Sequence, residues 1–369
     1  MIDPAQGLDA VTDVAFAGGR VAAIGAGLAG AETLDADGLI VTPGLIDLHT
    51  HVYWGGTSLG IDAEDFCRRS GVTTAVDTGS AGPGNFAGFR AHVIDRSAVR
   101  ILAYLHVAFG GIWGFGREVM VGESRDLAAM APRGARDVAA ANRDVVVGIK
   151  VRLGRIASGD HGTAPLEYAL AAAEAVGLPM MVHIDEPPPS YSEAVERLRP
   201  GDVLTHCFRP FPNAPLGGDG RVRPAVLAAR QRGVIFDVGH GKGSFAFETA
   251  RAMLGEGFAP DVISSDVHAL CIDGPAFDQV TTLSKFLCLG MELREVIRAT
   301  TEAPARALSR PELGTLAPGT PGDATLLRLA EGRFEYVDVL GETLVGDRRL
   351  EAEASVIAGR VFHDARRAA

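Results

Sequence analysis

The sequence predicts an α/β protein, a (β/α)8 TIM barrel that carries a small β-sandwich domain formed by both ends of the chain. Two observations predict the barrel. From residue 44 to about residue 310, short apolar strands alternate with amphipathic helical segments, which is typical of parallel strands joined by helices. The alternation contains eight strands, and its span of roughly 250 residues is the usual size of such a barrel.

Eight apolar segments have the length and composition of buried strands. They are Leu45–His49, Thr73–Asp77, Ile101–Ala108, Val145–Val151, Pro179–His183, Val203–His206, Val234–Val238 and Val262–Asp266. Helical segments lie between them, among them Ala63–Ser70, Ala164–Val176, Ser192–Leu198, Val222–Arg232 and Phe245–Leu254. Gly71, Gly177 and Gly233 stand just before the next strand, where glycine typically ends a helix.

The two ends of the chain have a different pattern, of short strands separated by turns. These strands are Val14–Phe16, Val21–Ile24 and Leu39–Val41, and then Ala324–Leu329, Phe334–Val339 and Ser355–Ile357. We expect residues 1–43 and 318–369 to form one small β domain together. The barrel, residues 44–317, is then inserted between its two halves.

Composition excludes several classes of protein. Hydrophobic residues make up 47% of the 369 residues and charged residues 22%, which excludes a disordered or fibrous chain. Acidic residues outnumber basic ones 46 to 35, and the net charge of −11 disfavours a nucleic-acid partner. The four cysteines form no C-x-x-C pair, and the start of the chain has no signal-peptide pattern. The longest uncharged stretch of interest, Ile101–Gly116, is too short and too glycine-rich for a membrane helix. We therefore expect a cytoplasmic protein with reduced thiols and no membrane partner.

One glycine motif resembles a nucleotide-binding fingerprint. Residues Gly25–Gly30 match G-x-G-x-x-G after a strand. That fingerprint needs a helix followed by a second strand, and only Ala31–Asp37 is available before the strand at Leu39. A hairpin turn is the favoured interpretation.

Potential metal ligands stand at the ends of the predicted barrel strands. His49 and His51 form an H-x-H pair whose side chains share one face of the first strand, so both can reach one ion. Further polar residues end the fourth, fifth, sixth and eighth strands: Lys150, His183, His206 and Asp266. Because barrel active sites form at the carboxyl ends of the strands, this constellation predicts a metal site.

The residue types indicate which chemistry the site performs. Four neutral imidazoles and one carboxylate suit zinc or a similar divalent ion. An ammonium group would repel metals, but a lysine with a lowered pKa can react with carbon dioxide as the free amine. The resulting carbamate of Lys150 (N6-carboxylysine) can bridge two ions, which make a water molecule acidic enough to be hydroxide at neutral pH. Asp266 can take the proton of that water and deliver it to the leaving group.

This order of residues, preceded by Pro43-Gly44-Leu45-Ile46-Asp47, resembles the amidohydrolase superfamily of metal-dependent hydrolases. The resemblance covers nearly the whole chain. It implies that the counterparts of His49, His51 and Asp266 hold one metal and those of His183 and His206 the second. It also implies that carboxylated Lys150 bridges the two ions.

Departures from other branches narrow the resemblance. Dihydroorotases usually carry Arg where this chain has Tyr53, and D-aminoacylases carry Cys near the end of the second strand, where this chain has Asp77-Thr78-Gly79. Adenosine and cytosine deaminases lack the bridging lysine. The runs His51–Thr57 and Gly239–Gly241 are most similar to the amidohydrolase/deacetylase branch, whose members are often labelled dihydroorotase-like. Family members usually have one more strand before Asp3-Pro4, so we expect either a trimmed β domain or a misassigned start.

Five further residues are candidates for substrate binding. Arg152 shares a strand face with Lys150, and we expect it to bind a substrate carboxylate. Trp113 belongs to an aromatic, glycine-rich loop that suits a lid or an apolar wall. Tyr53 and His240 follow strand ends and are placed to stabilise an oxyanion, whereas His268 is a candidate for orienting the substrate.

The sequence thus predicts a hydrolase with two metal ions, in which the hydroxide that bridges the ions attacks an amide or ester carbonyl. Its expected substrate is a small N-acyl amino acid or O-acyl hydroxy acid. Two alternatives stay open: a cyclic amidohydrolase acting on a dihydroorotate- or hydantoin-like ring, and a catalytically silent scaffold. The exact substrate and association into a homo-oligomer are left open.

Overall fold

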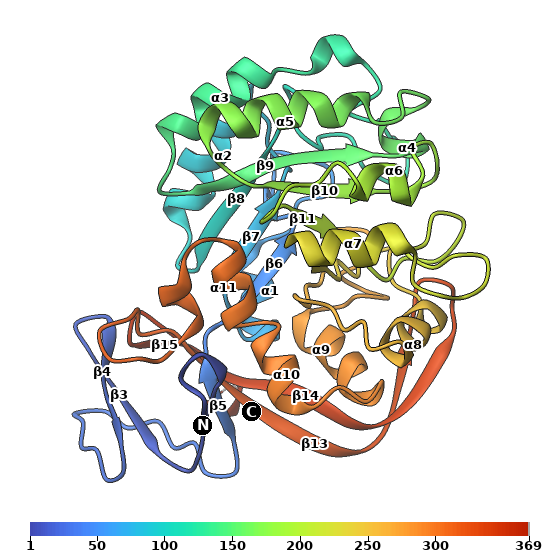
Figure 1. Cartoon of the computed structure of the whole chain (residues 1–369). Helices are drawn as coiled ribbons and strands as arrows, with labels where there is room; N and C mark the ends of the chain where they lie inside the picture. Colours follow the sequence, from blue (N-terminus) through green and yellow to red (C-terminus); the bar gives the residue numbers. More distant parts are fainter. Residues whose placement is uncertain (368–369) are drawn as a thin grey trace.

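The barrel wall is formed by parallel strands that follow one another in sequence order. In the computed structural model, which describes residues 1–367, seven of them form one sheet ordered β6 to β12 (Figure 1). They are β6 (Leu45–Thr50), β7 (Val72–Thr78), β8 (Arg100–His106), β9 (Val146–Leu153), β10 (Met180–Ile184), β11 (Val203–Thr205) and β12 (Ile235–Asp237). Each overlaps a strand that the sequence predicts, so the barrel prediction is confirmed.

The predicted eighth strand, Val262–Asp266, closes the barrel without forming a regular ladder. Val262 bridges Asp237 of β12, and Val267, just past the predicted strand, bridges Thr50 of β6, both in the parallel sense. Regular pairing is interrupted because Asp266 has a φ of 47°, outside the strand region.

Helices cover the outside of the barrel (Figure 1). They are α1 (Ala63–Ser70), α2 (Phe86–His92), α3 (Pro132–Ala141), α4 (Arg155–Ser158), α5 (Ala164–Val176), α6 (Tyr191–Val195), α7 (Pro224–Arg232), α8 (Phe247–Gly255), α9 (Gln279–Cys288), α10 (Leu293–Arg298) and α11 (Glu302–Ala307). α1 and α5 have the predicted bounds. Gly71, Gly177 and Gly233 cap three helices in the left-handed conformation, as their positions predict.

Two hydrophobic layers hold the barrel together. The inner layer includes Leu48, Leu102 and Met181 from the strands, and residues of α11 pack against it. The outer layer lies between strands and helices and includes Phe66 of α1 and Leu166 of α5. A rigid double layer of this kind keeps the strand ends, and hence the side chains on them, in fixed positions.

The two ends of the chain meet in a β-sandwich. β5 (Ile40–Pro43) pairs with β13 (Ala324–Val337) in a four-stranded sheet, which β14 (Thr343–Ile357) and β15 (Arg360–Asp364) complete. Near the start, β3 (Asp13–Ala17) pairs with β4 (Arg20–Gly25), and β1 (Ile2–Asp3) with β2 (Leu8–Asp9). This confirms the small β-sandwich, while its exact boundaries at residues 43 and 318 stay a prediction.

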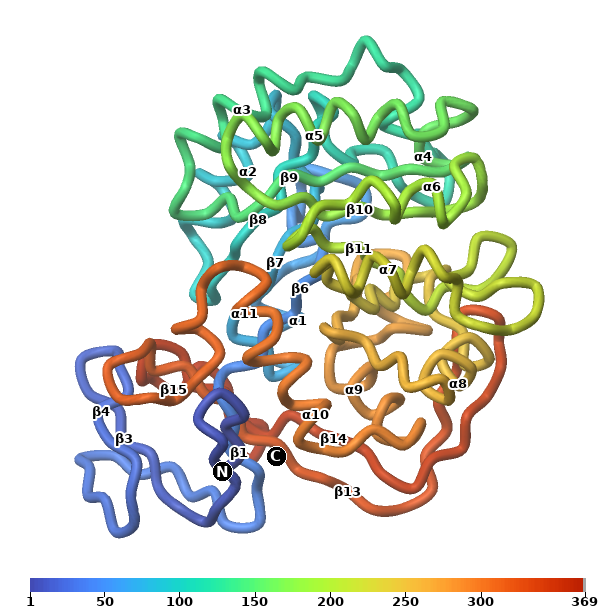
Figure 2. Tube along the Cα trace, in the orientation of Figure 1, coloured from blue at the N-terminus to red at the C-terminus, as the bar shows by residue number. Residues whose placement is uncertain are grey.

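The hairpin of β13 and β14 is much longer than the sequence predicts. Beyond the sandwich it runs along the barrel beside α9 towards α8 (Figure 2). The Leu350 amide donates to Ser284 of α9 at 2.9 Å, and the Val339 amide donates to the Phe245 carbonyl at 3.2 Å. The hairpin therefore ties the end of the chain to the barrel wall.

Three smaller expectations can be compared with the structure. Residues 26–39 contain no helix, as the rejected nucleotide fingerprint requires, but the expected hairpin turn is wrong because β4 and β5 belong to different sheets. All four cysteines are unpaired within residues 1–367, and three of them are buried. Among the described helices, none combines the length and apolar character needed to cross a membrane.

Candidate active site

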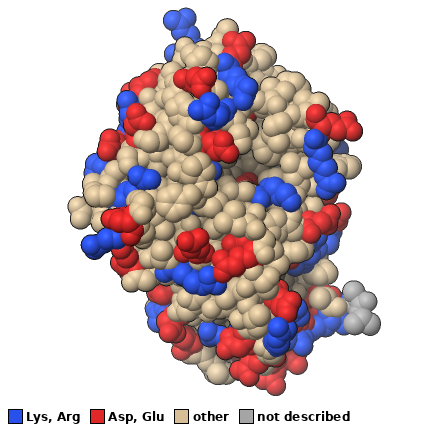
Figure 3. Space-filling model, turned by 90° about the vertical axis from the view of Figure 1, so that its right-hand side faces the viewer, with Lys and Arg blue, Asp and Glu red and all other residues tan. Residues whose placement is uncertain are grey.

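Side chains from five segments of the barrel meet at the carboxyl ends of its strands. The face that these ends form is hollowed near its centre (Figure 3). A cavity with about 290 Å³ of empty space opens there. It is lined by His49, His51, Leu59, Ile112, Phe115, Lys150, Arg152, His183, Asp266 and His268. The fold thus brings the predicted ligands of several strands to one place.

His49, His51 and Asp266 form a compact group of ligand atoms. Nε2 of each histidine lies 3.3 Å from Asp266 Oδ1. Nδ1 of His49 is 2.8 Å from the Thr205 hydroxyl, and Nδ1 of His51 is 2.9 Å from the Ser80 hydroxyl. Because these contacts occupy Nδ1, each ring presents Nε2 to the cavity, and partners of this kind commonly orient metal-binding histidines.

His183 and His206 form a second group beside the first. His183 Nδ1 and His206 Nε2 are only 2.6 Å apart. The other nitrogen of His206 lies 2.7 Å from the Gly239 carbonyl, so it carries the ring proton and leaves a lone pair on Nε2. His206 and Asp266 both have positive φ (69° and 47°), a strained conformation that concentrates at functional sites.

Burial keeps all four histidines neutral. It lowers the pKa of His49, His183 and His206 well below the usual value, and that of His51 to about 3. Neutral imidazoles have a free lone pair and are the form that binds metals. The ring chemistry therefore fits divalent ions.

Lys150 lies on β9, next to these groups, and its amine has no partner. The side chain is fully buried, and no residue of the described chain hydrogen-bonds to Nζ. Burial lowers its pKa to about 7, although the nearby Asp266 charge opposes this shift. An unpartnered amine among metal-ligand side chains fits a lysine that becomes a carbamate.

Two of the five predicted substrate-binding residues line the cavity. Arg152 lies under the ring of Phe115, with its guanidinium carbon 4.8 Å from the ring centre. The His268 ring is 6.0 Å from that of His51, and its Nδ1 accepts a hydrogen bond from the Leu270 amide. Burial lowers the pKa of His268 to about 4, so its ring is neutral.

The other three predicted residues, Tyr53, Trp113 and His240, do not line the cavity. The Tyr53 hydroxyl contacts the Asn85 carbonyl at 3.4 Å, and the Trp113 side chain is half exposed. His240 is fully buried, and its Nε2 lies 2.7 Å from Nζ of Lys285. Position after a strand end predicts nearness to the mouth, but it does not fix the direction of a side chain on a loop.

Sequence reasoning missed two residues of the site, His106 and Glu123. His106 ends β8 and lies opposite Lys150 in the strand register. Its Nε2 is 3.2 Å from the Glu123 carboxylate, which also contacts Arg152 at 3.4 Å. His106 stands at a strand end like the other ligands, so its position was a usable signal. Glu123 lies in an irregular loop and had no such signal.

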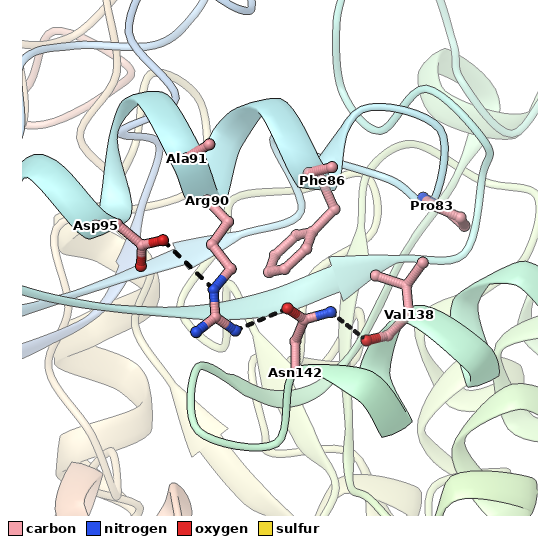
Figure 4. Close-up of a pocket in the computed structure, with 8 residues that line it drawn as sticks. Pro83, Phe86, Arg90, Ala91, Asp95, Val138 and Asn142 are labelled. Carbon is pink, nitrogen blue, oxygen red and sulfur yellow. Dashed lines mark hydrogen bonds and ion pairs between the residues drawn. The ribbon is translucent and has the colours of Figure 1, made fainter.

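A second hollow lies away from the strand ends, between α2 and α3 (Figure 4). It is larger, with about 530 Å³ of empty space, and Arg90 spans it between Asp95 and Asn142. Within residues 1–367, only His49, His51 and Asp266 form a cluster with metal-binding geometry. The chemistry of the molecule is therefore concentrated at the barrel mouth.

Two relatives resemble the chain along almost its whole length. A deacetylase of Brucella anthropi is 35% identical over 358 residues, which cover 96% of this chain and 88% of the relative. A deacetylase of Agrobacterium fabrum is 34% identical over 355 residues, which cover 95% of this chain and 86% of the relative. No protein-family model matches the sequence.

Solved structures show the same architecture. A dihydroorotase superposes with a TM-score of 0.90 at 34% identity, covering 97% of this chain and 96% of the other. An adenine deaminase superposes with a TM-score of 0.89 at 29% identity, covering 95% of both chains. A dihydropyrimidinase from Brevibacillus agri shares the fold. It superposes with a TM-score of 0.67 at 16% identity, covering 95% of this chain and 91% of the other.

Proposed function

Because this chain belongs to the amidohydrolase superfamily, as its full-length relatives show, we propose that it is a metal-dependent deacylase. Its substrate is an N-acyl amino acid or an O-acyl hydroxy acid. One observation supports this most: His49, His51 and Asp266 converge beside the unpartnered amine of Lys150. The names of the relatives support removal of an acyl group.

The residues of the mouth fit two divalent ions. His49, His51 and Asp266 would hold one ion, and His183 and His206 the other, with Lys150 between them as its carbamate. The amine of Lys150 forms this group when its nitrogen bonds to the carbon of carbon dioxide and its proton leaves to solvent. Zinc suits these nitrogen and oxygen ligands. Bound there, the ions would acidify a water molecule and polarise the substrate carbonyl.

Asp266 is the proposed general base and acid. Burial raises the pKa of the Asp266 carboxyl to about 6. Its carboxylate faces the cavity between the two histidine Nε2 atoms. From there it takes the proton of the attacking water and then gives it to the departing nitrogen or oxygen of the substrate.

Arg152 is the proposed anchor for a substrate carboxylate. Its guanidinium group lines the cavity, and an arginine can bind a carboxylate through two parallel hydrogen bonds. We expect Arg152→Met to raise KM for an anionic substrate about 10- to 100-fold, the range expected for losing a charged hydrogen bond. The neutral methyl ester of the same substrate is the control. An equal rise in KM for both substrates would contradict the proposal.

Metal analysis combined with a substrate screen tests the main proposal. We expect two ions per chain, a mass increase of one carbon dioxide on Lys150, and turnover of some N-acyl amino acids or O-acyl hydroxy acids. A fully active preparation that holds no more than one ion, with Lys150 unmodified, would refute the mechanism with two metals.

A cyclic amidohydrolase is the second candidate, favoured by the likeness to a dihydroorotase structure. Against it, Tyr53 stands where dihydroorotases usually carry arginine, and its hydroxyl contacts the Asn85 carbonyl outside the cavity. Assays with dihydroorotate and hydantoin beside the linear acyl substrates separate the two. Faster turnover of a ring substrate would favour the second candidate.

A further inference from the structure

The loop between β8 and α3, residues 107–131, brings three side chains to the barrel mouth. Ile112 and Phe115 line the cavity, and the buried Glu123 contacts Arg152, which also lines it. Glu123 is almost fully buried although it is charged, and a carboxylate in such a place requires partners. Its partners are residues of two neighbouring barrel strands.

The two oxygens of Glu123 serve different partners. Oε1 lies 3.2 Å from Nε2 of His106, and Oε2 accepts a hydrogen bond from Nη1 of Arg152 at 3.4 Å. Nδ1 of His106 accepts the Ala108 amide at 2.9 Å, so the proton of the neutral ring is on Nε2. Within residues 1–367 neither Nε2 of His106 nor Oε1 of Glu123 makes a hydrogen bond, so the two atoms are close but not aligned. Burial alone would raise the pKa of Glu123, but the Arg152 charge and His106 outweigh it and lower the pKa.

Arg152 is held on two sides and free on the third. The guanidinium carbon lies over the Phe115 ring, 4.8 Å from its centre, and Glu123 accepts a hydrogen bond from Nη1. Among residues 1–367, none accepts a hydrogen bond from its Nε or Nη2. The carboxylate of nearby Asp185 accepts hydrogen bonds from the amides of Ile156 and Ala157, each at 3.0 Å, and within residues 1–367 Arg152 forms its ion pair with Glu123 and not with Asp185. Glu123 is therefore the carboxylate that sets the orientation of Arg152.

We propose that Glu123 is a positioning residue for recognition of an anionic substrate. With His106 as its fixed support, it holds Arg152 so that the free edge of the guanidinium group meets the substrate carboxylate. The loop that carries Glu123 thus sets the preference for acyl derivatives of carboxylic acids. This inference rests on the proposed function, in which Arg152 binds that carboxylate.

Glu123→Gln tests the proposal because the amide carries no charge and replaces one carboxylate oxygen by an NH2 donor, so either Arg152 or His106 then faces a donor instead of an acceptor. We expect KM for an anionic N-acyl amino acid to rise about 10-fold, the lower range for the loss of a supporting partner. We expect kcat and metal content to change little and KM for the neutral methyl ester to stay the same, whereas Tm falls because Arg152 loses its buried charged partner. Glu118→Gln is the matched control, since Glu118 is exposed on the same loop. If the Gln variant fails to fold, Glu123→Asp, one methylene shorter, should give the same selective rise.

A double variant shows whether Glu123 acts through Arg152. Adding Glu123→Gln to Arg152→Met should raise KM for the anion no further, because the group it positions is already gone. An unchanged or lower KM for the anion in Glu123→Gln alone would overturn the inference, as would an equal rise for the ester or a loss of metal. If Arg152→Met does not separate anion from ester, the carboxylate proposal itself fails. If Arg152→Met separates them and Glu123→Gln does not, only the inference about Glu123 fails.

Discussion

Two lysines, Lys150 on β9 and Lys285 on α9, are completely buried, and burial lowers the pKa of both to about 7. Their surroundings are opposite. Nζ of Lys285 lies within hydrogen-bonding distance of three acceptors, the Pro275 and Val337 carbonyls at 2.9 and 2.8 Å and His240 Nε2 at 2.7 Å. Nζ of Lys150 has no partner in the described chain.

The difference separates a lysine whose contacts are structural from one whose amine is free for the proposed reaction. Three acceptors match the three N–H groups of an ammonium, so Lys285 is a satisfied polar group that joins α9 to the β13–β14 hairpin. An amine without a partner costs free energy in the fold, and such a cost is typical of functional sites. Burial alone would not distinguish the two residues.

The largest expected effect follows from Lys150→Met. We expect activity to fall at least about 100-fold, the upper range found even for residues that only support metal ligands. Metal binding should weaken as well, because the proposed bridging ligand is lost. Stability of the metal-free protein should stay the same or rise, since the amine that is removed had no partner. Steady-state kinetics, metal analysis and urea unfolding measure the three effects, and full activity with two bound ions would contradict the assigned role.

Gly79→Ala tests how closely the chain packs around Lys150. A Cβ at this position would lie 2.7 Å from Lys150 Cγ and 3.0 Å from His106 Cδ2, and the φ of +92° disfavours alanine. We expect activity to fall about 10-fold, with a loss of roughly 1–3 kcal/mol in stability. Gly162→Ala is the control for backbone strain alone, because its φ is +57° and nothing lies within 4 Å. Equal activity losses in both variants would show that crowding at Lys150 is unimportant.

Lys285→Met should act on stability instead of chemistry. It leaves two carbonyls and a histidine nitrogen without a donor, and we expect the free energy of unfolding to fall by about 1–3 kcal/mol. Activity per metal-loaded chain should fall far less than in Lys150→Met. Urea unfolding and kinetics on the same preparation measure both, and an activity loss as large as that of Lys150→Met would erase the contrast.

The stability lost in Lys285→Met should depend on pH, which provides an internal control. The pKa of Lys285 is about 7 in the fold and 10.5 for an ordinary lysine, so between these values the unfolded chain binds more protons. The contribution of Lys285 to stability therefore increases as pH rises above 7, by at most about 1.4 kcal/mol per pH unit. The difference in free energy of unfolding between wild type and Lys285→Met should grow as pH rises from about 7 towards 10.5 and stay constant below pH 7.

Strand periodicity and strand-end position predicted most of the fold and the place where the candidate ligands lie. His49, Lys150, His183 and Asp266 line the cavity as expected, because the carboxyl ends of parallel strands meet at one face. Loops behave differently, since their backbone is irregular and residue spacing no longer sets side-chain direction. For that reason the side chains of Tyr53 and His240 do not line the cavity, and the sequence did not predict Glu123 as a residue of the site. The extension of β13 and β14 was also missed because a bulge near Glu331 hides its alternation.

The long β13–β14 hairpin has a consequence for how the protein matures. Val337 supplies one acceptor of Lys285, and Asp338 accepts the Phe247 amide of α8 at 2.9 Å. On the ribosome, both arrive about fifty residues after α9 itself. In a nascent chain that stops before Val337, Lys285 of α9 would have two acceptors instead of three, and the Phe247 amide at the start of α8 would lack its Asp338 acceptor. The barrel thus reaches its final stability only after the β13–β14 hairpin has been synthesised.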